Sequence, residues 1–79
     1  MPDEKSPDQI IDLAMAKRDK GHAADSVPLV RNALEHNPRH IRLWHVLGLL
    51  YRALQDSAAA IDAFEHAMQL APEDPKISH

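Results

Sequence analysis

Six histidines and twelve acidic residues are the side chains of this 79-residue chain best suited to acid–base catalysis or metal binding. The chain has no cysteine, so thiol chemistry and thiolate metal sites are excluded. His36 and His40 are four positions apart, but Pro38 between them prevents one helix face from presenting both. His45 follows His40 by five positions, and His66 is expected to stand alone on the polar side of a helix. No H-E-x-x-H motif, paired carboxylate beside a histidine or glycine-rich phosphate loop occurs. The sequence therefore predicts ordinary solvated histidines, with no catalytic residue, no cofactor and no metal site.

The composition excludes further classes of protein. A formal net charge of -3 argues against nucleic-acid binding, which normally requires a basic excess. No segment approaches the roughly 18 apolar residues of a membrane span, and the polar start MPDEKSPDQ is unlike a signal peptide. We therefore expect a cytoplasmic protein with neither a nucleic-acid nor a membrane partner. Hydrophobic residues make up 44% of the chain but include one Trp, one Tyr and one Phe, so its core must be largely aliphatic, which suits helices better than sheets.

The stretch from residue 41 to 51, IRLWHVLGLLY, has the spacing of a helix that is apolar over most of its circumference. At about 100° per residue, one side of this helix carries Trp44, Leu47, Tyr51, Leu54, Leu43 and Leu50. Val46 and Leu49 extend the apolar surface around the other side, which is wider than the stripe of an ordinary surface helix. We therefore expect a central helix with neighbours on at least two sides. Gly48, which costs about 1 kcal/mol relative to Ala in a free helix, indicates that another backbone approaches closely there.

A longer pattern runs downstream from this helix: Trp44-x2-Leu47-Gly48-x2-Tyr51, then Ala60-x3-Phe64-x2-Ala67, then Pro72. It resembles the tetratricopeptide repeat, and Pro38 stands one period of 34 residues before Pro72. The resemblance implies an all-α fold of two antiparallel helix-turn-helix hairpins, stacked as a short right-handed α-solenoid. Gln55 departs from the pattern, since the family usually has a turn glycine there, and this leaves the turn geometry open.

The resemblance and the local sequence divide the chain into four segments. Residues 1–5 are expected to be a disordered tail, and residues 6–38 a degenerate first repeat, because Lys17 falls where Tyr51 falls one repeat later. Residues 39–74 form the second repeat. Residues 75–79 either begin a truncated third helix pair or form a disordered tail.

Local signals place the helix ends in the first repeat. Ser6-Pro7-Asp8-Gln9 reads as a capping box, so the first helix is expected from Pro7 to about Asp19, with Gly21 in the turn that follows. Asp25 is expected to cap the second helix, because Pro28 fits only into a first turn whose N–H groups are unpaired. Asn37-Pro38 is expected to end it.

In the second repeat, only one of the two helices has a clear capping residue. The third helix is expected to begin near His40 or Ile41, where no good capping residue is available. The fourth helix is expected to be capped by Asp56-Ser57 and to stop at Pro72.

The resemblance also implies a binding surface, because in this family the first helix of every repeat lines a concave face that binds peptides. The matching positions are Ile11, Asp12, Met15, Arg18, Arg42, His45, Val46, Leu49 and Arg52. Exposed apolar residues flanked by charges are typical of a protein-binding patch. The alternative is that Ile11, Met15, Val46 and Leu49 simply pack the two first helices together. The family's carboxylate clamp needs Lys and Asn where this chain has Ile11, Met15 and Val46, so a chaperone-tail partner is not expected.

Three functions remain open at this point. The first is a non-enzymatic protein interaction module or scaffold that binds a protein or peptide on the concave face. The second is an N-terminal assembly or dimerisation module of a larger enzyme, such as a transferase or oxygenase. The third is a free-standing small homo-oligomer. Because at least three repeats are usually needed, we expect either a fragment of a longer chain or an open face, carrying Ile61 and Met68, that a second copy covers.

Overall fold

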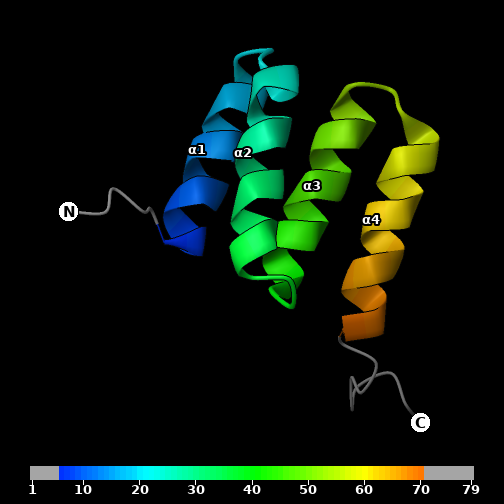
Figure 1. The fold of residues 1–79 in the computed structure, drawn as a ribbon. Coiled ribbons are helices and arrows are strands. Elements are labelled where there is room, and N and C mark those ends of the chain that lie inside the picture. Colours follow the sequence, from blue (N-terminus) through cyan, green and yellow to red (C-terminus); the bar gives the residue numbers. More distant parts are fainter. Residues whose placement is uncertain (1–5, 71–79) are drawn as a thin grey trace, which may run out of the picture.

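The computed structural model describes residues 6–70, and within this range the chain forms four helices and no strand (Figure 1). Their bounds are α1 Pro7–Asp19, α2 Ala23–His36, α3 Ile41–Ala53 and α4 Ser57–Leu70. The predicted all-α fold of two helix-turn-helix hairpins is confirmed. The tails predicted at residues 1–5 and 75–79, and the stop at Pro72, lie outside the described residues.

Helix α3 holds the structure together, because it packs against each of the other three helices. Helix α1 packs against α2 and α3, whereas α4 packs on α3 alone among the described helices. The prediction that the apolar stretch of residues 41–51 forms a central helix with several neighbours is therefore confirmed. Among the described helices, the second hairpin therefore contacts the first through α3.

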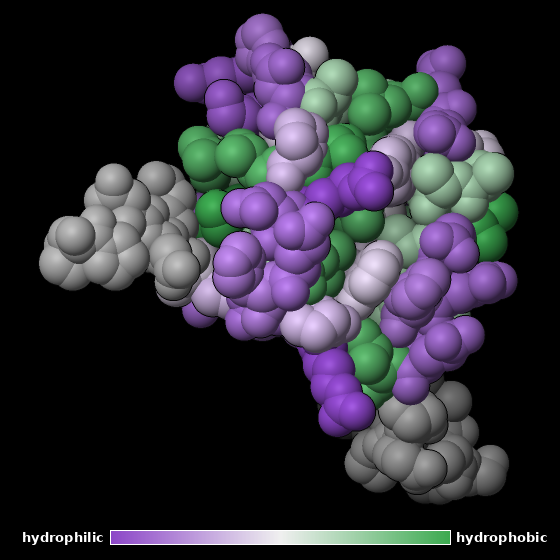
Figure 2. Space-filling model, in the orientation of Figure 1, coloured by the Kyte–Doolittle hydropathy of each residue, from purple (hydrophilic) through white to green (hydrophobic). Residues whose placement is uncertain are grey.

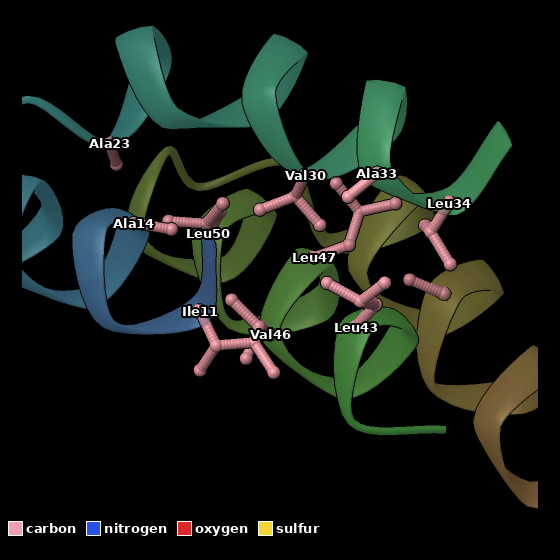
Figure 3. Packing of buried hydrophobic residues seen from close by; sticks show 11 residues of the cluster. Ile11, Ala14, Ala23, Val30, Ala33, Leu34, Leu43, Val46, Leu47 and Leu50 are labelled. Carbon is pink, nitrogen blue, oxygen red and sulfur yellow. The ribbon is translucent and has the colours of Figure 1, made fainter. Parts of the chain in front are cut away.

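The core lies between α1, α2 and α3 and is aliphatic (Figure 3). Its largest completely buried hydrophobic side chains are Leu43, Leu50 and Val30. The remaining members of this cluster are Ile11, Ala14, Ala23, Ala33, Leu34, Val46, Leu47 and Ala63. Burial of each large aliphatic side chain contributes about 1.5–3 kcal/mol relative to exposure. Two of these three large side chains, Leu43 and Leu50, come from α3, so this helix contributes much of the buried aliphatic surface.

The first helix begins where the sequence places it. The Ser6 side chain accepts a hydrogen bond from the Gln9 backbone N–H (3.3 Å), and the Ser6 backbone N–H donates to Gln9 Oε1 (3.0 Å). Pro7 occupies the first helical position, where its missing N–H is not needed. The predicted capping box is thus confirmed.

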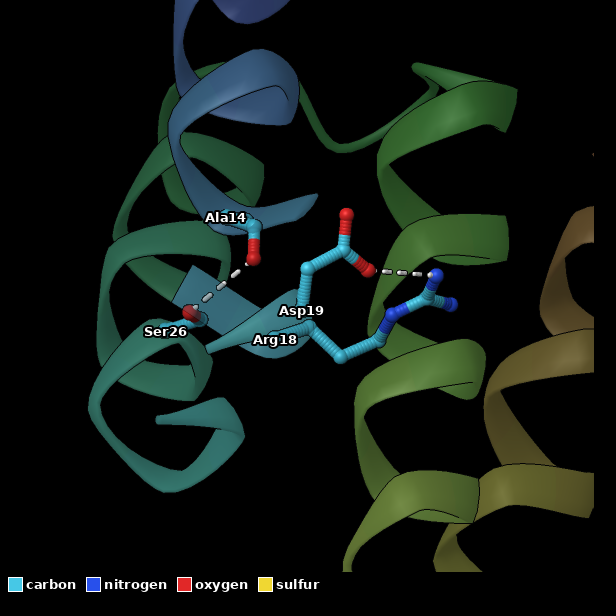
Figure 4. A network of polar contacts seen from close by, with 4 residues as sticks. All are labelled: Ala14, Arg18, Asp19 and Ser26. Atoms are coloured by element: carbon cyan, nitrogen blue, oxygen red, sulfur yellow. Dashed lines mark hydrogen bonds and ion pairs between the residues drawn. The ribbon is translucent and has the colours of Figure 1, made fainter. Parts of the chain in front are cut away.

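The predicted start of the second helix is wrong. Helix α2 begins at Ala23, so Asp25 lies within its first turn and Pro28 lies inside the helix. The proline ring removes the N–H that would bond the Ala24 carbonyl, but Ala24 is exposed and water can satisfy that group. Tertiary packing explains the earlier start, because Ser26 in this turn is buried and its hydroxyl donates to the Ala14 carbonyl of α1 (3.2 Å) (Figure 4).

Both helices of the second hairpin have side-chain caps. The Leu43 N–H donates to His40 Nδ1 (3.3 Å), so the expectation that α3 lacks a capping residue is wrong. An imidazole nitrogen without a proton is an acceptor and can replace the usual hydroxyl or carboxylate. At the start of α4, Asp56 Oδ1 accepts from the Ala59 N–H (3.3 Å), which confirms the predicted cap.

The turn at Gln55 has the same geometry as the turn at Gly21, which answers the question that the missing glycine left open. Gly21 has a φ of 83° and Gln55 a φ of 62°, so both are in the left-handed region. The following residues close equivalent hydrogen bonds, His22 N–H to the Lys17 carbonyl (2.7 Å) and Asp56 N–H to the Tyr51 carbonyl (2.9 Å). The loss of glycine therefore leaves the fold intact and places a non-glycine residue in an unfavourable conformation.

Candidate protein-binding site

The surface shared by α1 and α3 carries the predicted concave-face residues, but it does not expose all of them. Ile11 and Val46 are each only 5% exposed and lie beside one another between the two helices (Figure 3). They belong to the core cluster. For these two residues, the alternative that they pack the helices together is the correct one, and no partner can contact them without separating α1 from α3.

The other predicted residues remain on the surface. Asp12, Arg42, His45 and Arg52 are exposed, whereas Met15, Arg18 and Leu49 are half-buried. Three of the α3 residues are cationic or can become so, namely Arg42, His45 and Arg52. The structure therefore leaves a face with basic groups around a small apolar area rather than a broad apolar groove.

Two arginines of this face already have carboxylate partners. Arg42 Nη1 lies 3.7 Å from Asp8 Oδ1, which connects the first turns of α3 and α1. Arg18 Nη2 lies 3.3 Å from Asp19 Oδ1 and extends toward α3 (Figure 4). Exposed ion pairs of this kind contribute no more than about 1 kcal/mol, so a carboxylate of a partner can replace either one at little cost.

Gly48 fixes the distance between α3 and α4, but through a side chain rather than a backbone. A Cβ atom at Gly48 would lie 2.5 Å from Cε1 of the Phe64 ring, closer than packed carbon atoms approach. The expectation that another backbone approaches there is therefore wrong, because the neighbour is this aromatic ring. The same ring lies 5.4 Å from the His45 ring between centroids, which helps to position His45 at the edge of the α1–α3 face.

His66 is not a solitary histidine on a polar side, as the sequence suggested. Its ring stacks on Trp44, with ring centroids 4.3 Å apart and planes inclined by 11°. Trp44 is held at its other end, since its Nε1–H donates to the Pro38 carbonyl (2.9 Å). His66 lies one helical turn after the buried Ala63, and the packing of α4 on α3 brings its ring onto Trp44, which residue spacing within α4 does not indicate.

A second concave surface, which the sequence did not predict, lies between α2 and α4 with α3 as its floor. This interhelical cavity has a volume of about 410 Å³. Its lining residues are Arg31, Leu34, Glu35, Trp44, Leu47, Tyr51, Ala59, Asp62 and Ala63. In the space-filling view, apolar and weakly polar surface lies between the hydrophilic rows over α2 and α4 (Figure 2). At about 100° per residue, Leu47 and Leu49 point to nearly opposite sides of α3, so this cavity and the α1–α3 face are separate sites.

The outer side of α4 exposes two large apolar residues. Ile61 is 57% exposed and Met68 is 71% exposed. This placement agrees with the expectation that they belong to an open face of the second hairpin, while the contact itself stays a prediction.

Residues 6–70 contain neither a metal-binding cluster nor a membrane-spanning helix. No group of three His, Cys, Asp or Glu side chains there is arranged to hold a metal ion. None of the four described helices has the length and hydropathy needed to cross a membrane.

Two antiparallel helical hairpins that share one aliphatic core define a helical repeat protein. Residues 41–74 match the family model of the tetratricopeptide repeat, and the helical hairpin α3–α4 lies within this matched range. Such repeats are, in general, protein–protein interaction modules, and the predicted resemblance is confirmed.

Among curated proteins, the chain is similar to Protein FlbA of Caulobacter vibrioides, with 31% identity over 67 residues. The aligned part is 85% of this chain but 11% of FlbA, so the chain spans about a tenth of that relative's length. No solved structure gives a significant match to the chain.

Proposed function

We propose that this protein is a non-catalytic interaction module that binds a protein or peptide segment on the face shared by α1 and α3. The preferred segment carries acidic residues beside an apolar anchor. The observation that supports this proposal is the exposure of Arg42, His45 and Arg52 on α3 around the half-buried Leu49. These residues are spaced by three, four and three positions, so they form one stripe along the helix.

Charge gives this face its selectivity. A partner carboxylate near Arg42 or Arg52 gains an attractive interaction, whereas a partner cation meets like charge, which disfavours it. Leu49 and Met15 supply the apolar contact area between the charged groups. Because the charged groups are exposed, added salt should weaken their attraction to a partner. At 0.1 M salt the Debye length is about 10 Å, and exposed charges farther apart than this are largely screened.

Peptide-library binding at low and at physiological salt tests the proposal. The wild type should select acidic peptides with one large apolar residue, and Arg42→Glu/Arg52→Glu should lose this selection. Lys20→Glu/Arg39→Glu is the matched control, because it changes the net charge equally at exposed residues away from the stripe. Preference for basic peptides, or unchanged binding by Arg42→Glu/Arg52→Glu, contradicts the proposal.

A second candidate function is assembly through α4, for which the exposure of Ile61 and Met68 is the supporting observation. Full burial of each side chain is worth about 1.5–3 kcal/mol, a large contribution for so small a core. A two-fold contact between copies, or a contact with another part of a longer protein, would supply that burial.

Sedimentation of the wild type and of Ile61→Glu/Met68→Glu tests this second candidate. The wild type should associate at micromolar concentrations, and the double variant should be monomeric. Ala58→Glu/Gln69→Glu adds the same charge at other exposed positions of α4 and should leave association unchanged. A monomeric wild type over that range contradicts assembly.

A further inference from the structure

The interhelical cavity between α2 and α4 has the properties of a second binding site. Its volume of about 410 Å³ falls within the range of about 300–1,000 Å³ that is usual for ligand pockets. It exists because α4 packs on α3 and not on α2, which leaves the two outer helices as separate walls. The floor is apolar and aromatic, formed by Trp44, Leu47 and Tyr51.

One of the two aromatic rings of the floor, that of Trp44, is held in place before any partner binds. Trp44 is stacked on His66 at 4.3 Å and donates its indole N–H to the Pro38 carbonyl at 2.9 Å. A side chain that is fixed at both ends loses little conformational freedom when a partner contacts it. Such preorganisation favours binding because less entropy is lost on association.

The charges on the rim determine what the cavity can accept. Glu35 lies on the α2 wall and Asp62 on the α4 wall, so a carboxylate stands on each side of the floor. Arg31, one turn before Glu35, is the single guanidinium among the lining residues. Within residues 6–70, the Asp62 carboxylate forms an ion pair with His66 Nδ1 alone, at 3.7 Å, and both of these side chains are substantially exposed. The rim is therefore net acidic over a floor of two aromatic rings.

We propose that this cavity binds a segment of a partner protein in which an arginine or lysine stands next to a leucine or similar apolar side chain. The apolar side chain fills the space over Leu47, and the basic side chain lays its methylene stem on the floor with its cation between Glu35 and Asp62. Cations are also attracted to the faces of Trp and Tyr rings, so the floor and the rim favour the same charge. A nucleic acid or an acidic peptide is disfavoured, because its negative charge would meet both carboxylates.

The cavity and the α1–α3 face thus have opposite charge preferences on opposite sides of α3. The proposal does not depend on the function proposed for the α1–α3 face. A single copy could hold an acidic segment on one side and a basic segment on the other, which would make it an adaptor between two partners.

The experiment uses the full chain and Trp44, its single tryptophan, as a fluorescent reporter. The probes are three capped peptides without tryptophan: Arg-Leu-Leu-Arg, Gln-Leu-Leu-Gln and Glu-Leu-Leu-Glu. The Arg peptide should change Trp44 emission saturably, with roughly tenfold tighter binding than the Glu peptide at low salt. Glu35→Arg/Asp62→Arg should reverse this order, and Ala59→Leu, which fills the cavity from α4, should weaken all binding.

Arg42→Glu/Arg52→Glu is the matched control on the opposite side of α3. It should bind the Arg peptide like the wild type even though it should fail in the library test of the α1–α3 face. Circular dichroism verifies that each variant keeps its helical content. Equal affinity for the Arg and Glu peptides, or an unchanged order in Glu35→Arg/Asp62→Arg with native helicity, overturns the proposal.

Discussion

The two hairpins have helices of equal lengths and equivalent turns, but different side chains join the two helices in each. Gly21 and Gln55 close equivalent turns, with N–H to carbonyl distances of 3.0 Å to Arg18 and 3.0 Å to Arg52. In the α1–α2 hairpin, the Ser26 hydroxyl connects the two helices through a buried hydrogen bond. In the α3–α4 hairpin, the Phe64 ring lies against Gly48 instead. A repeat can therefore lose its signature residues and keep its geometry when another contact joins its two helices.

The comparison also shows how residue size is balanced between corresponding positions. Ala14 and Val30 in the first hairpin stand 34 residues before Gly48 and Phe64 in the second. The larger residue on the second helix occurs together with the smaller residue on the first. All three aromatic residues lie in the second hairpin. Trp44 and Tyr51 line the cavity, while the rings of Trp44 and Phe64 lie against those of His66 and His45. The α3–α4 hairpin thus carries all the aromatic residues of the chain, while both hairpins contribute aliphatic residues to the core.

The largest expected effect concerns Leu47 and Leu13, which occupy the same position in the two hairpins. Leu47 is 5% exposed and Leu13 is half-buried. Leu47→Ala should lower the free energy of unfolding by about 2–5 kcal/mol, and Leu13→Ala by clearly less, because less apolar surface is lost. Urea denaturation followed by circular dichroism measures both. An equal or larger loss in Leu13→Ala would show that the burial of this position does not determine the cost of truncation.

A double-mutant cycle at Gly48 and Phe64 tests the balance of sizes. Gly48→Ala should destabilise by up to about 2 kcal/mol, because overpacking costs about 1–3 kcal/mol and exceeds the gain of about 1 kcal/mol in helix propensity. In a Phe64→Val background, which copies the Ala14 and Val30 pairing, the same change should be neutral or stabilising. Urea denaturation of the four proteins gives the coupling energy. A coupling energy of zero would mean that the ring does not determine the need for glycine.

Ser26→Ala tests the polar contact of the first hairpin. It should cost about 0.5–1.5 kcal/mol, because the buried hydroxyl donates to the Ala14 carbonyl and the substitution removes that bond. Ser57→Ala, at an exposed position in α4, is the control and should change stability by no more than about 0.5 kcal/mol. Thermal unfolding monitored by circular dichroism compares the two. If both substitutions have the same effect, the hydroxyl does not join α1 to α2.

The smallest effects are expected at the turns. Gln55→Gly should stabilise the protein by up to about 1 kcal/mol, because glycine adopts the positive φ without the steric cost that a side chain meets. Gly21→Gln should destabilise it by a similar amount for the same reason. The two shifts in urea midpoint should therefore have opposite signs. A stabilising Gly21→Gln would refute the equivalence of the two turns.

Some details of the fold follow from neighbouring residues and were predicted correctly. The reciprocal bonds of Ser6 and Gln9, and the cap by Asp56, join groups only three residues apart. The helix over residues 41–53 follows from the spacing of its apolar residues. The sequence could not identify the His40 cap in the same way, because a histidine becomes an acceptor only when its ring is turned toward the helix start.

The sequence by itself determined the helices, their pairing into hairpins and the resemblance of residues 41–74 to the tetratricopeptide repeat, since these depend on the period of 3.6 residues and on the 34-residue repeat. Only the tertiary structure decided which surfaces remain available. Ile11 and Val46 share a concave-face pattern with exposed residues, yet they are buried because α1 packs on α3. The start of α2, the stack of His66 on Trp44 and the cavity over Leu47 likewise arise from contacts between separate helices. Their geometry depends on the packing of whole helices, and residue spacing within one helix does not specify it.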